Sequence, residues 1–184
     1  MNRYTISNLK PSMRAEIAQA AALLQRVFAP QGSWVTQAEA DEEVAEMLAP
    51  ERILRVALAE EQVIGWIGGI PGYDGNVWEL HPLVVAPEWQ GQGIGTALVR
   101  DFEVLVLAKG GLTIQLGSDD VTGATSLSGV DLYTDIWEKL RTIRNLKRHP
   151  FEFYQKQGYT IIGVVPDANG RGRPDILMGK RVGQ

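Results

Sequence analysis

The chain has 184 residues, a formal net charge of −4 at pH 7 and no cysteine. This length suits one domain with a substantial core, so we predict a single domain over residues 1–184. The apolar fraction of 45% and the charged fraction of 22% are typical of a globular protein and exclude extended disorder. Without cysteine the chain has no disulfide, thiolate metal site or cysteine nucleophile.

The acidic charge balance narrows the class of partner. A net negative charge lacks the excess of basic residues expected of a protein that binds nucleic acid or an anionic membrane, and it suits a cationic partner. No apolar stretch is long enough to span a bilayer, and residues 1–10 contain no apolar signal region. We therefore predict a cytoplasmic protein that binds neither nucleic acid nor membrane, and we expect no metal site.

The first third of the chain alternates between strand and helix patterns. RYTISNL, residues 3–9, predicts a strand, and apolar residues at steps of three and four predict a helix between Pro11 and Pro30. Thr36 is the expected cap of a second helix, residues 37–48. That helix is acidic, and we interpret its charges as a solvated face; a wall that attracts a polycation is the alternative. Two β-branched runs within residues 53–70 predict a hairpin.

The rest of the chain continues the alternation. We predict strands at residues 77–87, 112–116, 159–165 and 176–180. We predict helices through Leu98–Val106 and over residues 135–143 and 150–157, and a long polar loop over residues 118–129. Strands interleaved with helices indicate an α/β (α+β) sheet layered by helices.

Glycines follow an apolar strand in LVVAPEWQGQGIGTAL, residues 83–98. Backbone N–H groups without a neighbouring Cβ approach an anion closely, and the start of the next helix adds unpaired donors. The segment therefore predicts a cradle for a diphosphate. No lysine follows the last glycine, which argues against a P-loop, and the third glycine of a dinucleotide fingerprint is missing. Glycines that serve only packing are the remaining alternative.

VVAPEWQGQGIGTAL resembles the acetyl-coenzyme A motif of the GNAT acetyltransferase superfamily, with Gln90, Gly93 and Gly95 at the pattern positions. With WELHPLVV, HPFEFYQKQGY and PDANGRGRPDILMGKR, it is similar to the aminoglycoside 6′-N-acetyltransferases. The resemblance implies a GNAT-type mixed, largely antiparallel twisted sheet with a splayed central strand, flanked by helices. It also implies acetyl-coenzyme A as co-substrate and a homodimer. The expected cofactor-binding residues are Leu83, Val84, Val85, Gln90, Gly91, Gln92, Gly93, Ile94, Gly95 and Thr96.

Strand alternation places Glu79, His81 and Leu83 on one face. An amine that attacks a thioester must first lose its proton, so we interpret Glu79 as the base, acting directly or through water. His81 then orients water or the acceptor. The alternative is a structural pair in which Glu79 only bonds His81.

Pro82 in mid-strand predicts a bulge that parts the strand from its neighbour and frees the Leu83 N–H. In the resembled family that amide polarises the thioester carbonyl. The resemblance also gives Tyr154 the role of general acid, which suits a phenol that stays protonated at neutral pH. A core role for Tyr154 is the alternative. His149 stands where many family members carry asparagine, which puts a cofactor contact there in doubt.

An aminoglycoside carries several ammonium groups, so its site is expected to be acidic. The candidates are Asp119, Asp120, Asp131 and Asp135, with Tyr73 and Trp34 as stacking surfaces and Glu79 and His81 at the reacting amine. For each, an ordinary loop or surface position is the alternative.

The leading hypothesis is therefore acetyl transfer to the 6′-amine of an aminoglycoside, by direct attack in a ternary complex. A second enzyme hypothesis is acetylation of another small amine, a polyamine or a protein N-terminus. A third is a binding module that senses acetyl-coenzyme A without turnover, and a nucleotide-binding Rossmann module is the remote fourth.

Overall fold

The computed structural model describes residues 4–183, and the chain divides into two compact units. The first unit is Met1–Ile114 with Val182–Gln184, and the second is Gln115–Arg181. The single domain expected from length stays a prediction.

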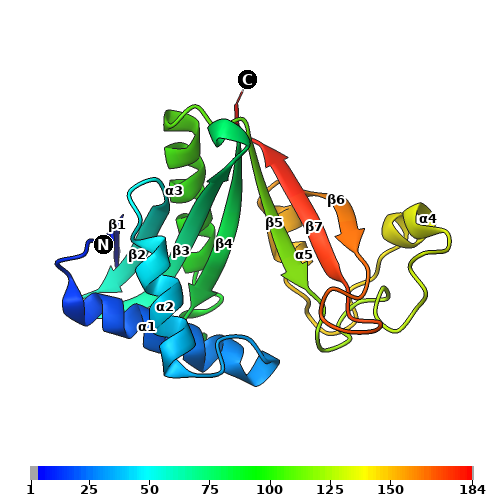
Figure 1. Cartoon of the computed structure of the whole chain (residues 1–184), viewed down its shortest axis with the longest axis horizontal. Helices are drawn as coiled ribbons and strands as arrows, with labels where there is room; N and C mark the ends of the chain where they lie inside the picture. The colour runs from blue at the N-terminus through cyan, green and yellow to red at the C-terminus, as the bar shows by residue number, and fades with distance from the viewer. Residues whose placement is uncertain (1–3, 184) are drawn as a thin grey trace. The chain divides into compact units, whose positions relative to one another are not determined.

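The sheet of the first unit is antiparallel throughout its described pairings (Figure 1). Its strands, in neighbouring order, are β1 (Thr5–Asn8), β2 (Ile53–Ala59), β3 (Gln62–Gly72) and β4 (Val77–Val85). The predicted hairpin is confirmed as β2 and β3, and the first predicted strand as β1; its residue 3 lies outside the described part of the chain.

Three helices flank this sheet: α1 (Arg14–Phe28), α2 (Gln37–Met47) and α3 (Ile94–Ala108). Three short 3₁₀ helices join the elements: η1 (Ala29–Gln31), η2 (Tyr73–Gly75) and η3 (Pro87–Trp89). Thr36 caps α2 as predicted. Its hydroxyl accepts from the Glu39 N–H while the Glu39 carboxylate accepts from the Thr36 N–H, which satisfies two otherwise unpaired donors.

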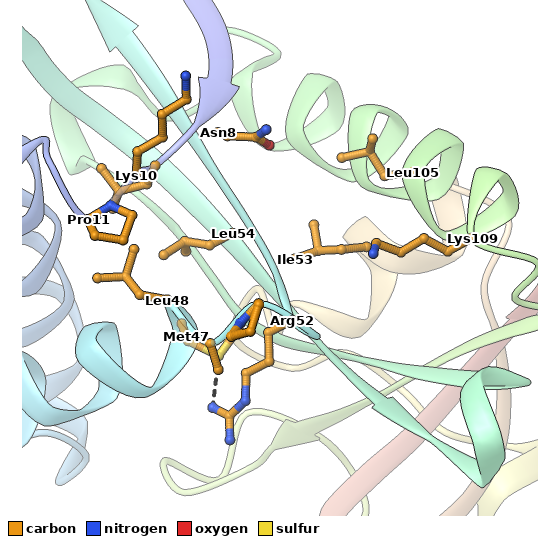
Figure 2. A pocket seen from close by; sticks show the side chains of 13 residues that line it. Asn8, Lys10, Pro11, Met47, Leu48, Arg52, Ile53, Leu54, Leu105 and Lys109 are labelled. Atoms are coloured by element: carbon orange, nitrogen blue, oxygen red, sulfur yellow. Dashed lines mark hydrogen bonds between the residues drawn. The ribbon is translucent and has the colours of Figure 1, made fainter.

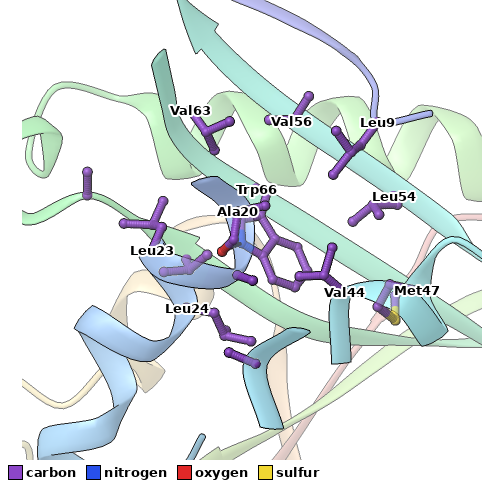
Figure 3. Close-up of a cluster of buried hydrophobic side chains, with 14 residues drawn as sticks. Leu9, Ala20, Leu23, Leu24, Val44, Met47, Leu54, Val56, Val63 and Trp66 are labelled. Atoms are coloured by element: carbon purple, nitrogen blue, oxygen red, sulfur yellow. Dashed lines mark hydrogen bonds between the residues drawn. The ribbon is translucent and has the colours of Figure 1, made fainter. Parts of the chain in front are cut away.

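Strand β3 lies between α1 and α2 on one face and α3 on the other. Large side chains and glycines alternate along it, so the two faces pack differently. Trp66 is fully buried among residues of α1 and α2, and its indole N–H donates to the Ala20 carbonyl at 3.0 Å (Figure 3). On the opposite face, a Cβ at Gly65 would lie 3.3 Å from Leu98, and one at Gly69 would lie 2.2 Å from Phe102. The glycines therefore let α3 pack directly on the β3 backbone.

The predicted bulge in β4 is confirmed. Ile67 of β3 pairs with Leu83 and Gly69 pairs with Leu80, so that two residues, His81 and Pro82, oppose the single Gly68. The His81–Pro82 peptide bond is cis. The bulge reverses the alternation that the sequence predicted. Glu79 is half-buried opposite Ile70, on the face of β3 that carries Trp66, whereas Leu83 is half-buried opposite Ile67, on the face of Gly65 and Gly69. The prediction that Glu79 and Leu83 share a face is therefore wrong, because two residues of β4 occupy one position of the ladder.

The second unit contains most of β5 (Thr113–Asp119), then α4 (Ile136–Arg141), α5 (Phe151–Lys156), β6 (Thr160–Val165) and β7 (Asp175–Arg181). β5 neighbours β7, which pairs antiparallel with β6. These elements confirm the predicted helices and strands, and the mixed, mostly antiparallel architecture confirms the predicted fold class. No helix within residues 4–183 combines the length and apolar character needed to cross a membrane.

Gly68 tests how tightly the bulge is packed. A Cβ there would lie 2.3 Å from the His81 carbonyl oxygen and 2.3 Å from Met47 Cε. We expect Gly68→Ala to lower the free energy of unfolding by about 1–3 kcal/mol, because the added methyl must displace the bulge or the core.

Gly72→Ala is the matched control for this substitution. Gly72 lies at the end of the same strand and has φ −134°, and a Cβ added to it would have no neighbouring atom nearer than 3.7 Å. We expect its unfolding free energy to change by less than about 1 kcal/mol in urea titrations. Equal stability of the two variants would contradict the tight packing at Gly68.

Candidate active site

The predicted phosphate cradle is an exposed turn between η3 and α3. Gly91 and Gly93 have φ of 72° and 84°, a left-handed backbone conformation that residues other than glycine rarely adopt. No atom lies within 4 Å of where their Cβ atoms would be, so the backbone is open to a ligand. Gly93 is the N-cap of α3, and no side chain caps that helix. Its first-turn N–H groups and positive dipole end are therefore suited to an anion.

Two glutamines shape this turn. The Gln90 side-chain amide donates to the Val85 carbonyl at 3.0 Å, and that of Gln92 donates to the Glu88 carbonyl at 3.0 Å. Glu88 is in turn held by Arg26 of α1 at 3.1 Å. Both predicted glutamines therefore hold the turn in place through their amides. The turn fits a diphosphate, because its backbone donors are exposed and its conformation is braced.

A cavity of about 370 Å³ lies elsewhere in the first unit, among β1, the end of α2, β2 and α3 (Figure 2). Its charged lining is basic: Lys10, Arg52 and Lys109. None of its lining residues belongs to the predicted catalytic, co-substrate or acceptor set. We therefore build the site from the turn and from β4 rather than from this cavity.

Glu79 is half-buried on β4, opposite Ile70 of β3. Within residues 4–183 its carboxylate has no hydrogen bond or ion pair, although its charge acts on His81. The alternative in which Glu79 is held by a direct bond to His81 is therefore not seen. A half-buried, unpaired carboxylate is suited to accept a proton or to contact an ammonium group.

His81 pairs instead with Glu43 of α2. The His81 Nε2 atom lies 3.7 Å from Glu43 Oε1, and the side chains are 37% and 17% exposed. The Trp34 indole N–H donates to Glu43 Oε2 at 3.3 Å. The Trp34 ring also lies against His81, with ring centroids 5.7 Å apart. Trp34, His81 and Glu43 thus form one cluster, which we call the His81 cluster.

The His81 cluster shifts two pKa values in opposite directions. The interaction with the Glu43 carboxylate raises the pKa of His81; burial opposes this, and the charge of Glu79 adds to it. For Glu43, burial alone would raise the pKa, but His81, the Trp34 N–H and the Arg52 charge together outweigh burial and lower it. The cluster therefore favours a charged pair.

Glu43 was not singled out by the sequence interpretation, which grouped it with a solvated acidic face. A positional signal was present. Glu43 lies three residues after Ala40 and four before Met47, and both are buried. That spacing places Glu43 on the flank of the helix that meets the sheet.

Tyr154 lies on α5 in the second unit, buried against two other aromatic rings. Its ring centroid is 5.1 Å from that of Phe153 and 5.7 Å from that of Tyr159. Burial raises the pKa of Tyr154 above its ordinary value, so the phenol stays protonated throughout the physiological range. The residue has the packing of a core side chain together with the protonation state that an acid needs.

Asp119, the last residue of β5, and Asp120, which follows it, lie in different environments. Asp119 is exposed, and its carboxylate accepts from the Asn169 amide at 2.5 Å. Asp120 is fully buried and accepts three hydrogen bonds, from the Ala124 N–H at 2.6 Å and from the Thr125 N–H and hydroxyl at 2.8 and 2.7 Å. Asp120 therefore anchors the following loop, and an acceptor contact by it would compete with those donors.

His149 also has a structural environment. Its Nδ1 accepts from the Phe151 N–H at 3.2 Å, and its Nε2 lies 3.1 Å from the Asp119 carbonyl oxygen. The Asn145 side chain forms two hydrogen bonds with the backbone of His149: it accepts from the His149 N–H and donates to the His149 carbonyl. Burial lowers the pKa of His149, which favours the neutral ring.

The other predicted acceptor residues lie at the surface of their units. Tyr73 is 76% exposed on η2 of the first unit. Asp131 and Asp135 are exposed in the second unit, where the Asp131 carboxylate accepts from the Tyr133 N–H at 2.9 Å and Asp135 precedes α4. Acceptor binding by these residues stays a prediction.

The sequence matches the Acetyltransferase (GNAT) family over residues 15–127. Among solved structures, an aminoglycoside 6′-N-acetyltransferase complexed with coenzyme A is 42% identical, with a TM-score of 0.92. The aminoglycoside 6′-N-acetyltransferase from Enterococcus faecium is 42% identical, with a TM-score of 0.89. An aminoglycoside 6′-acetyltransferase type Ii is 36% identical, with a TM-score of 0.75. Each similarity covers 97% of both chains. A search of the curated proteins finds no match.

The two histidines of the chain should titrate on opposite sides of the ordinary value of 6.5. We expect an NMR pH titration to place the His81 midpoint above 6.5, because Glu43 stabilises its charged form, and that of His149 below it. The contribution of His81 to stability is then present below pH 6.5 and is lost as pH rises through its folded pKa. His149 destabilises the fold as pH falls below 6.5. A His81→Gln variant assigns the signals, and a reversed order would contradict both environments.

Proposed function

Because the chain belongs to the GNAT acetyltransferase family, we propose that it transfers the acetyl group of acetyl-coenzyme A to the 6′-amine of an aminoglycoside. One observation carries the choice of acceptor: two solved aminoglycoside 6′-N-acetyltransferases are 42% identical to this chain over 97% of both chains. The cationic acceptor also suits the net charge of −4.

The turn before α3 is proposed to hold the diphosphate of acetyl-coenzyme A. Its support is the pair of left-handed glycines, Gly91 and Gly93, and the absence of a side-chain cap on α3. The proposed contact set is the predicted one: Leu83, Val84, Val85, Gln90, Gly91, Gln92, Gly93, Ile94, Gly95 and Thr96.

Glu79 is proposed as the base. An aminoglycoside amine is mostly protonated at neutral pH, and the half-buried carboxylate of Glu79 is free to hold the ammonium and to take its proton, directly or through water. The neutral nitrogen then attacks the carbonyl carbon of the thioester. His81 is proposed to orient the acceptor or the intervening water.

Two further groups are proposed to act on the thioester. The Leu83 N–H, next to the bulge, would stabilise the oxyanion as the new C–N bond forms. When the C–S bond breaks, the sulfur leaves as a thiolate, and Tyr154 would supply its proton; the raised pKa of the buried phenol keeps that proton available. The acylated nitrogen loses its second proton as the intermediate collapses, which balances the proton that Tyr154 gives to the sulfur. The products are the N-acetyl aminoglycoside and coenzyme A, without a covalent enzyme intermediate.

Trp34, Tyr73, Asp119, Asp120 and Asp135 are proposed to serve the acceptor, with Asp120 acting through the loop that it anchors. We further propose a single domain that works in the cytoplasm, where acetyl-coenzyme A is made and used, and a homodimer as the assembly.

Mixing the purified protein with acetyl-coenzyme A should release free thiol when an aminoglycoside with a 6′-amine is added. Kanamycin and tobramycin are the test acceptors, and an analogue with a 6′-hydroxyl is the matched control, since it lacks the nucleophile. Thiol release with polyamines or peptides and not with aminoglycosides would replace this acceptor with the second hypothesis. Binding of acetyl-coenzyme A without turnover would support the sensor hypothesis.

Glu79→Gln and Tyr154→Phe should each lower kcat for this reaction by about 10²–10⁴-fold, the usual contribution of a general base or acid. Calorimetric affinity for acetyl-coenzyme A should stay within threefold of wild type, because neither group is proposed to bind the diphosphate. Wild-type kcat in Glu79→Gln would remove the carboxylate from the mechanism.

A further inference from the structure

We propose that Glu43 is a positioning residue for acetyl transfer: its carboxylate, held by the Trp34 indole, pairs with His81 and leaves Glu79 as the unpaired negative charge on that face of β4. The inference rests on the proposed function. It assigns a role to α2 that the acidic-helix pattern did not reveal.

The hydrophobic core fixes the helix that carries Glu43. Ala40 and Val44 are fully buried and Met47 is 1% exposed, and all three belong to the core around Trp66 (Figure 3). The Thr36–Glu39 capping box fixes the start of the same helix. Glu43 therefore projects from a rigid element, which is a requirement for holding another side chain in place.

Each Glu43 oxygen has its own partner. Oε2 accepts from the Trp34 N–H at 3.3 Å, while Oε1 lies 3.7 Å from His81 Nε2. Trp34 is itself held from two sides, with ring centroids 5.3 Å from Phe28 and 5.7 Å from His81. Because the indole is a donor only, it can fix the orientation of the carboxylate without neutralising its charge.

The charged groups around His81 explain how the Glu43–His81 pair would affect Glu79. The groups that act on it are Glu43 from α2, Glu79 from its own strand and Arg52 from the segment before β2. Arg52 is paired with Glu46 at 3.4 Å. With Glu43 present, the imidazolium has a partner and Glu79 remains available for the acceptor ammonium. Without it, Glu79 is the carboxylate left near His81, and the imidazole N–H competes with the acceptor for it.

Glu43→Gln removes the charge and keeps the shape, and Glu42→Gln is its matched control. Glu42 is exposed on the same helix, so both variants lose one acidic charge from α2. We expect NMR titration to show the His81 midpoint at lower pH in Glu43→Gln and unchanged in Glu42→Gln. This readout needs no turnover, so it tests the Glu43–His81 pair even if the proposed function fails. An unchanged His81 midpoint in Glu43→Gln would overturn the proposal.

Kinetics then test whether the pair serves catalysis. We expect Glu43→Gln to lower kcat/KM for the aminoglycoside by about tenfold, a usual size for coupled neighbouring residues, while Glu42→Gln has no effect. Added to His81→Gln, the same change should cost less than about twofold, because no imidazole remains to compete for Glu79.

A purely structural role for Glu43 would lower kcat/KM equally in both backgrounds, and that result would overturn the proposal. Thermal unfolding of all four variants separates lost folding from lost positioning. If the wild-type protein does not acetylate aminoglycosides, the proposed function is wrong. The NMR titration then still tests whether Glu43 pairs with His81.

Discussion

The proposed chemistry depends on the close approach of two strands at Gly68. His81 and Pro82 occupy the space opposite one residue of β3, and that residue has no side chain to resist them. The bulge sets the positions of Glu79 before it and Leu83 after it, so one packing contact orients the base and the amide at the same time. Met47 closes the other side of Gly68, and this links the bulge to α2, the helix that carries Glu43.

Three carboxylates of this chain differ in how many partners they have, and the number follows their proposed roles in the fold or in the reaction. Asp120 is fully buried and accepts three hydrogen bonds, as a buried charge must. Glu43 is half-buried, with one hydrogen-bond donor and a pairing imidazole. Glu79 has neither within the described chain. The number of partners falls as the proposed involvement in the reaction rises, because a group that is already satisfied has little to offer a ligand.

The sequence predicted the order and type of the elements because periodicity, caps and glycines act locally. Thr36 as a helix cap and Pro82 as the mark of a bulge are local signals, and both are confirmed. Glu43 was missed because its importance comes from a residue 38 positions later in the chain, His81, and pairing across that separation leaves no pattern. Asp120 was grouped with Asp119 for the same reason, since composition does not distinguish an exposed aspartate from one whose oxygens are occupied.

The unpaired polar groups of the first unit occur where a substrate would use them. The turn before α3 is braced by Gln90, Gln92 and Arg26, yet the helix start itself has no side-chain cap. Within residues 4–183, Glu79 is likewise left unpaired, although its neighbours in β4, Trp78 and Leu80, are buried. Folding alone gains nothing from these exposed donors and this carboxylate, so their stabilisation is realised only on binding. This division, with braced supports around unsatisfied reacting groups, is the arrangement expected of a preorganised transferase site.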